Sequence, residues 1–136
     1  MIDIELLRKA VLKDLRLAAL AIDLLNIDPI IITGIHYCNG EKYWFKHGKI
    51  HRENGPAIEY KDGRKVWYRS GKIHREDDPA IEYTDGSKYW YKNGKAHRED
   101  GPAVERANGT KAWYKNNKLH REDGPAIDYS NGYKEW

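Results

Sequence analysis

Residues 90–112 read WYKNGKAHREDGPAVERANGTKA, and the same pattern recurs along most of the 136-residue chain. The five tryptophans are spaced 23 residues apart, at Trp44, Trp67, Trp90, Trp113 and Trp136. A fixed period of this length is typical of a repeat protein in which every unit is one small motif. Four units agree at most positions, and residues 34–43 match the second half of a further unit. The sequence therefore predicts about four and a half repeats beginning near Thr33.

Each unit contains dipeptides that favour tight turns. Asp-Gly or Asn-Gly occurs at residues 62–63, 85–86, 108–109 and 131–132. These dipeptides are typical of two-residue hairpin turns, in which both central residues take positive φ. Such a turn at residues 62–63 would place Ile58 opposite Trp67, so we expect these two side chains to share the buried face. A second glycine in each unit becomes Asn117 in the last, which predicts a second turn because asparagine tolerates positive φ.

The units must stack on one another to form a stable protein. A 23-residue hairpin buries too little apolar surface to offset the entropy of ordering its own chain. Contacts between neighbouring units supply the difference in repeat proteins. We therefore expect residues 33–136 to form an elongated antiparallel β-hairpin array.

Residues 1–32 have a different pattern. Apolar residues from Ile4 to Leu25 follow three-and-four spacing, which is typical of an amphipathic helix that ends before Asp28 and Pro29. The expected fold class is thus mainly β, with an N-terminal α-helix and linker at residues 1–32. This helix would either cap the array or join two copies, which makes residues 4–27 a candidate homo-oligomer contact.

Composition narrows the choice of partner. Lys and Arg total 24 against 21 Asp and Glu, and a net charge of +3 is small for a protein that binds nucleic acid. Cys38 is the only cysteine, so an internal disulfide is excluded and a reducing compartment is favoured. The sequence shows neither an export signal nor a membrane span. These features predict a cytoplasmic protein and disfavour nucleic acid and membranes as partners.

The units resemble the MORN repeat family in its bacterial and phage variant form. The resemblance rests on the aromatic pair, the Asn-Gly-Lys turn and the Asp-Gly or Asn-Gly hairpin in every 23-residue unit, as in residues 90–112, and it covers residues 33–136. This chain reads Arg-Glu-Asp-Gly-Pro-Ala where the usual repeat has a second Gly-x-Gly element. The resemblance implies hairpins laid side by side in a curved strip, no catalytic activity, and a role as a protein-interaction or membrane-proximal scaffold. We expect no cofactor. Some variant-repeat proteins are antitoxin-like, which adds the expectation of an inhibitor that binds and blocks a partner.

A His-Arg-Glu element occurs in all four units, at residues 51–53, 74–76, 97–99 and 120–122. These residue types suit acid–base chemistry, but an active site needs one constellation, whereas a copy in every unit is typical of a stacked side-chain ladder. We expect the arginine of one unit to meet the glutamate of the next. Histidines one repeat apart are too distant to share a metal ion. The prediction is therefore a protein that is not an enzyme and that holds no metal.

Aromatic and basic residues supply the candidate contact residues. Lysines interleaved with aromatics, as in KYWYK at residues 88–92, are typical of single-stranded nucleic-acid binding, but the many acidic residues oppose this interpretation. We instead expect an exposed tyrosine row with adjoining cations to contact a protein partner. The predicted strip consists of Tyr68, Arg69, Tyr91, Lys92, Tyr114 and Lys115.

Residues that break the repeat are further candidates, although neutral drift explains them as well. Arg106 replaces the tyrosine that other units carry, and Asp78 replaces a glycine. The first half-repeat carries His36, Tyr37 and His47, which would be the polar groups of a cleft beside the helix. A small anionic ligand such as a nucleotide, bound there or between subunits, is the alternative function to protein binding.

Overall fold

The computed structural model describes residues 33–136. Every element in this range is a strand or a turn. The expected combination of a helix with a β array is therefore wrong for the described part of the chain, which is a β array alone. The helix predicted within residues 1–32 lies outside the described residues.

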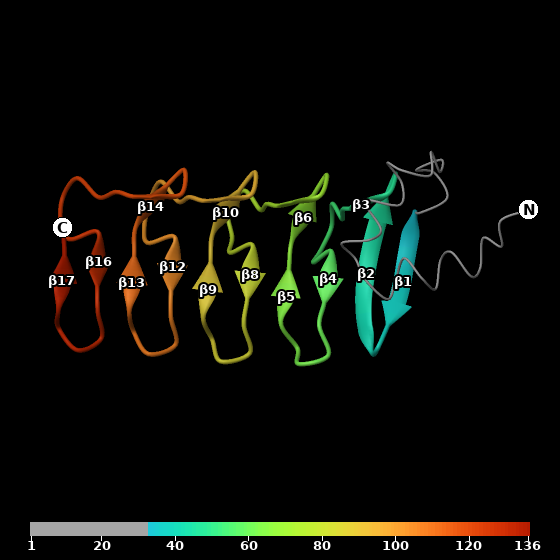
Figure 1. The fold of residues 1–136 in the computed structure, drawn as a ribbon, viewed down its shortest axis with the longest axis horizontal. Helices are drawn as coiled ribbons and strands as arrows, with labels where there is room; N and C mark the ends of the chain where they lie inside the picture. The colour runs from blue at the N-terminus through green and yellow to red at the C-terminus, as the bar shows by residue number, and fades with distance from the viewer. Residues whose placement is uncertain (1–32) are drawn as a thin grey trace, which may run out of the picture.

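The array is one long antiparallel sheet with small hairpins along one border. The 11-stranded sheet runs in the order β1-β2-β4-β5-β8-β9-β12-β13-β16-β17, and β3 pairs with β2. Its strands are β1 (Gly34–Cys38), β2 (Glu41–Lys46), β3 (Lys49–Ile50), β4 (Ile58–Glu59), β5 (Lys65–Val66), β8 (Ile81–Glu82), β9 (Lys88–Tyr89), β12 (Val104–Glu105), β13 (Lys111–Ala112), β16 (Ile127–Asp128) and β17 (Lys134–Glu135). The border hairpins are β6 (Tyr68–Arg69) with β7 (Lys72–Ile73), β10 (Tyr91–Lys92) with β11 (Lys95–Ala96), and β14 (Tyr114–Lys115) with β15 (Lys118–Leu119). Figure 1 shows the units side by side in chain order, with the strands of the long sheet lying across the long axis.

The repeat period and the antiparallel hairpins are confirmed, but the register at the Asp-Gly turns is wrong by one residue. Ile58 pairs with Val66, not with Trp67. The Gly63 N–H donates to the Tyr60 carbonyl, and the Tyr60 N–H donates to the Arg64 carbonyl, so the loop has three residues. A three-residue loop needs positive φ only at its last position, and Gly63 supplies it at 88°. The aspartate before it acts through its side chain, since Asp62 Oδ1 accepts a hydrogen bond from the Arg64 N–H at 2.9 Å.

The second turn of each unit is confirmed, and it is here that the two-residue geometry occurs. Arg69 pairs with Lys72 across Ser70 and Gly71. Both central residues take positive φ, 51° at Ser70 and 77° at Gly71. In the last unit Asn117 takes the glycine's place at φ 66°, as its tolerance of this region predicts.

The two faces of the sheet differ. Tyr43, Phe45, Ile58, Val66 and Ile81 form the buried cluster of one face, which we call the aromatic face. Side chains alternate along an extended chain, and Trp67 follows Val66, so Trp67 lies on the opposite face. We call this second face the groove face, and it also carries the His-Arg-Glu elements. The expectation that Ile58 and Trp67 share a buried face is therefore wrong.

Backbone hydrogen bonds join each unit to the next. The Gly94 N–H donates to the Ile73 carbonyl at 2.8 Å, and the Arg75 N–H donates to the Tyr91 carbonyl at 3.2 Å. The pairing of β5 with β8 crosses the same kind of boundary in the long sheet. The units thus stack as the sequence predicts, and each unit's turns depend on its neighbour.

Candidate functional site

The His-Arg-Glu histidines link neighbouring units on the groove face. His74 is buried, with 8% of its surface exposed. Its Nδ1 accepts a hydrogen bond from the Asn93 N–H of the next unit at 3.1 Å, and its Nε2 lies 2.9 Å from Glu76 Oε1. Asn93 Oδ1 lies 3.0 Å from His74 Nδ1, so His74 contacts both the backbone and the side chain of Asn93. The same inter-unit bond joins His51 to Ser70 and His97 to Asn116.

The arginines of these elements cover the tryptophan rings. The Arg98 guanidinium carbon lies 4.0 Å from the centre of the Trp90 ring, a cation–π geometry. Its Nη1 also donates to the Pro102 carbonyl at 3.2 Å and to Glu105 at 2.9 Å. The other units repeat the stack, with Arg52 on Trp44, Arg75 on Trp67 and Arg121 on Trp113. All of these arginine contacts stay within one unit and so stabilise the unit itself.

The expected pairing of arginine with the glutamate of the next unit is wrong. A lysine of the next unit takes that role, since Lys92 Nζ lies 3.1 Å from Glu76 and Lys115 Nζ lies 3.7 Å from Glu99. The hydrogen bond from Lys92 is the main reason that the pKa of Glu76 lies below its usual range, and the bond from His74 adds to it. Glu76 is therefore ionised at neutral pH and joins two units electrostatically.

We expect Lys92→Met to raise the pKa of Glu76 toward its ordinary value, because the strongest donor to the carboxylate is lost. A depressed carboxyl pKa contributes stability above the unfolded pKa, and this contribution disappears as the pH falls through the folded pKa. The variant should thus lose less stability than wild type on acidification. Carbon-detected NMR of the Glu76 carboxyl across an acid titration measures the shift. Arg69→Met is the matched control, because Arg69 lies 3.9 Å from Glu76, and an equal rise in both variants would contradict the assignment to Lys92.

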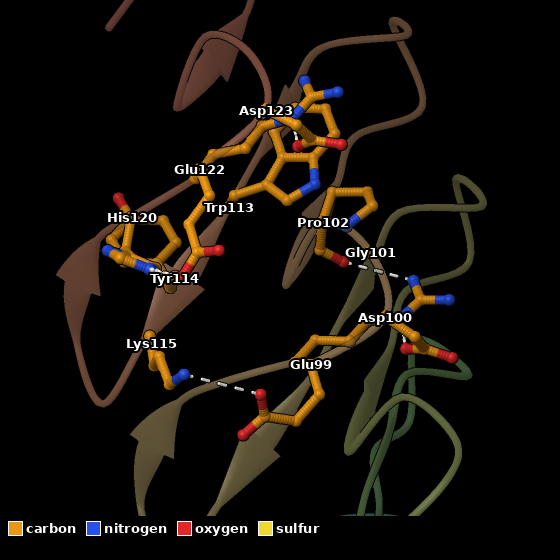
Figure 2. A pocket seen from close by; sticks show the side chains of 12 residues that line it. Glu99, Asp100, Gly101, Pro102, Trp113, Tyr114, Lys115, His120, Glu122 and Asp123 are labelled. Atoms are coloured by element: carbon orange, nitrogen blue, oxygen red, sulfur yellow. Dashed lines mark hydrogen bonds and ion pairs between the residues drawn. The ribbon is translucent and has the colours of Figure 1, made fainter.

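Two neighbouring units together form an open groove on this face (Figure 2). The third unit contributes Glu99, Asp100 and Pro102, and the fourth unit faces them with Trp113 and Lys115. The volume is about 680 Å³. A smaller groove of about 240 Å³ is lined by equivalent residues of the first and second units. Both grooves are lined by charges of both signs, so they are suited to contact a binding partner whose own surface is polar and charged.

The structure separates the tyrosines of the predicted contact strip from its cations. Tyr68 and Tyr91 are half-buried and pack against the aromatic-face cluster, where burial raises the pKa of both hydroxyls. Tyr114 is likewise half-buried. The cations Arg69, Lys92 and Lys115 are exposed, and each lies beside a glutamate on the groove face. The tyrosine row is thus not exposed, and partner binding by these six residues stays a prediction.

The three polar groups of the predicted cleft do not converge. His36 packs its ring edge against Phe45, with 5.3 Å between ring centroids. Tyr37 is the next residue of β1 and points to the other face, with 67% of its surface exposed. His47 lies in the two-residue turn at φ 51°, and its N–H donates to Thr33 Oγ1. The helix expected to form the other wall of this cleft falls outside the described residues, so ligand binding there stays a prediction.

One lysine of each unit forms no ion pair within residues 33–136 and also faces another cation across its hairpin, a combination that sets it apart from the other lysines. These four residues, which we call the lysine row, are Lys49, Lys72, Lys95 and Lys118. Each lies directly opposite another cation across the second turn of its unit: Lys46, Arg69, Lys92 and Lys115 respectively. Like charges opposite one another destabilise a hairpin. The signal in the sequence is a lysine after the second turn of every unit, but its lack of a partner becomes visible only in the fold.

The lysine stems lie along the turns of the next unit. A Cβ placed on Gly71 would lie 3.8 Å from Lys49 Cβ, and one on Gly94 would lie 3.8 Å from Lys72 Cβ. Each unit adds two strands to the long sheet, and strands are about 4.8 Å apart, so successive ammonium groups recur roughly every 10 Å. The row is thus a regular line of unpaired charge.

No family model and no curated protein matches this chain. The structure itself is a repeated antiparallel hairpin array with a spacing of about 23 residues, which is compatible with a MORN-like repeat. Within residues 33–136 there is no helix of the length and apolarity that crossing a membrane requires. The same residues contain no group of three histidine, cysteine or acidic side chains placed to hold a metal ion.

Proposed function

We propose that this chain is a non-enzymatic, MORN-like interaction protein that binds an acidic surface of another protein through the lysine row and the grooves beside it. The lysine row carries the proposal. Four successive units each place two cations opposite one another, and only one cation of each pair has a glutamate within its own unit or the preceding one, as in Lys46–Glu53 and Lys92–Glu76. An acidic partner would supply the missing charges and relieve the repulsion.

The charge pattern favours a protein over a nucleic acid. Glu53 and Glu76 line one groove and Glu99 lines another, so fixed carboxylates would face a phosphate backbone that followed the lysine row. The tryptophan faces that would stack on bases are covered by arginine, as Arg98 covers Trp90. A protein surface with acidic residues and a few basic ones fits both the lysines and the glutamates.

An elongated array with a long surface is suited to covering a partner's site, which supports the role of an antitoxin-like or phage-type inhibitor. The resemblance to variant MORN repeats supports the same role. We further propose a cytoplasmic location, since Cys38 is the only cysteine of the chain.

The experiment neutralises the lysine row and compares it with an equal number of other exposed lysines. The row variant carries K49Q, K72Q, K95Q and K118Q, and the control carries K42Q, K65Q, K88Q and K111Q, all of which are exposed positions. A protein captured by the wild-type chain is identified by mass spectrometry and titrated against all three proteins. Four surface charge pairs at a few tenths to about 1 kcal/mol each predict that the row variant binds about tenfold or more weakly.

Stability and salt dependence complete the test. The row variant should melt at the same temperature as wild type or higher, because the like-charge pairs have been removed. Its affinity should also depend less steeply on salt concentration. Equal weakening by the row and control variants would contradict the proposal, and so would a captured partner that proves to be nucleic acid.

A further inference from the structure

The buried cluster of the aromatic face stops at the third unit. Its members and the side chains packed against it extend only as far as Tyr91. Three positions of this face change character just beyond that point. Ala96 stands where the other units have Ile50, Ile73 and Leu119; Arg106 where they have Tyr60, Tyr83 and Tyr129; and Ala112 where preceding units have Tyr43, Val66 and Tyr89.

The three changes meet in one place and leave a cavity of about 350 Å³. The size is at the lower end of the range for small-molecule pockets, about 300 to 1,000 Å³. Tyr91, Tyr114 and Tyr129 line it together with apolar side chains such as Ile127. Arg106 is the only charged residue of the lining, and it forms no ion pair within residues 33–136. The cavity thus combines aromatic walls with one unpaired cation.

We propose that this cavity binds a small aromatic carboxylate. The planar guanidinium of Arg106 matches a carboxylate with two parallel hydrogen bonds, which a phenol or an amine cannot accept in the same way. The tyrosine rings offer faces and edges against which a flat aromatic body packs. The remaining wall atoms belong to side chains such as Ala96 and Ala112, whose small size leaves the room for that body.

The cavity is independent of the protein-binding surface proposed above. Ala96 lines the cavity, whereas its neighbour Lys95 belongs to the lysine row and points to the other face of the hairpin. A ligand in the cavity would therefore leave the lysine row accessible. Failure of one proposal would not affect the other.

The residues of the other units provide a variant that fills the cavity. A96I, R106Y and A112V together give the third unit the residues found at Ile73, Tyr83 and Val66. These side chains extend the buried cluster, so the filled variant should melt at a higher temperature than wild type. Loss of ligand binding in that variant would thus not reflect unfolding.

The test is an NMR titration of the ¹⁵N-labelled full chain with 2-naphthoate, and with naphthalene-2-carboxamide as the uncharged match. We expect saturable shifts at the amides of Arg106, Thr110 and Ala112 and none along the lysine row. Arg106→Gln should weaken 2-naphthoate about tenfold or more, since a charge-assisted bond is lost, and should leave the carboxamide unchanged. The filled variant should bind neither compound.

Three results would overturn the proposal. The first is no saturable binding of 2-naphthoate to the wild-type chain. The second is binding of equal strength to the filled variant, which would place the ligand elsewhere. The third is equal affinity for 2-naphthoate and the carboxamide, which would show that Arg106 does not bind the carboxylate.

Discussion

Trp90→Ala is expected to lower the free energy of unfolding by about 3 to 5 kcal/mol, the usual cost of truncating a buried tryptophan. Trp90 is the most buried tryptophan of the array, with 7% of its surface exposed. Its ring supports the Arg98 guanidinium, and only its backbone N–H, which the substitution keeps, forms a hydrogen bond, to the Ala103 carbonyl at 2.8 Å. The truncation therefore leaves a cavity and removes the surface on which Arg98 rests. Urea unfolding followed by circular dichroism measures the loss.

Trp136→Ala is the matched control for this prediction. Trp136 follows the fourth unit at the same repeat position, but 88% of its surface is exposed. Its truncation should change stability by less than about 0.5 kcal/mol, as is usual for a surface site. Comparable losses in the two variants would show that burial under arginine does not account for the role of the tryptophans.

Ile58→Ala is expected to cost about 2 to 5 kcal/mol, because it removes the centre of the aromatic-face cluster. Ile58 is 2% exposed, and it pairs with both Val66 and Tyr43 across the sheet. The cavity would lie between β2, β4 and β5, where the side chains have little freedom to close it. Thermal unfolding gives the stability change, and amide hydrogen exchange should show the largest loss of protection in the first unit.

Ile35→Ala makes the corresponding exposed change. Ile35 lies in β1, where half of its surface is exposed, so its truncation removes few contacts. We expect less than half the effect of Ile58→Ala. A larger effect at Ile35 than at Ile58 would locate the core of the first units away from the aromatic-face cluster.

The sequence predicts the units of this fold better than their register. The 23-residue spacing is sufficient to indicate stacked hairpins, because only contact between neighbours makes such short units stable. The one-residue error at Asp62-Gly63 arises because this dipeptide suits two loop lengths, and the Asp62 side-chain bond to the Arg64 N–H selects the longer one. The shorter loop would put Trp67 on the same face as Ile58, whereas the longer one pairs Ile58 with Val66.

The candidate sites are less predictable from the sequence. They depend on the sheet face on which each side chain lies and on the neighbouring unit that it contacts. The sequence shows that the His-Arg-Glu element recurs in every unit, but not that Lys92 rather than an arginine reaches Glu76. Arg106 was visible as a break in the repeat. Its combination with Ala96 and Ala112 into one cavity required knowing that all three lie on the aromatic face.

The orientation of the strands across the long axis has a mechanical consequence. A force pulling the array lengthwise acts along the inter-strand hydrogen bonds, and it loads every strand pair in series (Figure 1). Pairs such as β5 with β8 are only two residues long, so each yields by peeling open and not by sliding. Stretched between two attachment points, the array would extend in steps of one unit at low force and rewind when released. The array would therefore behave as a soft, reversible spring and not as a rigid rod.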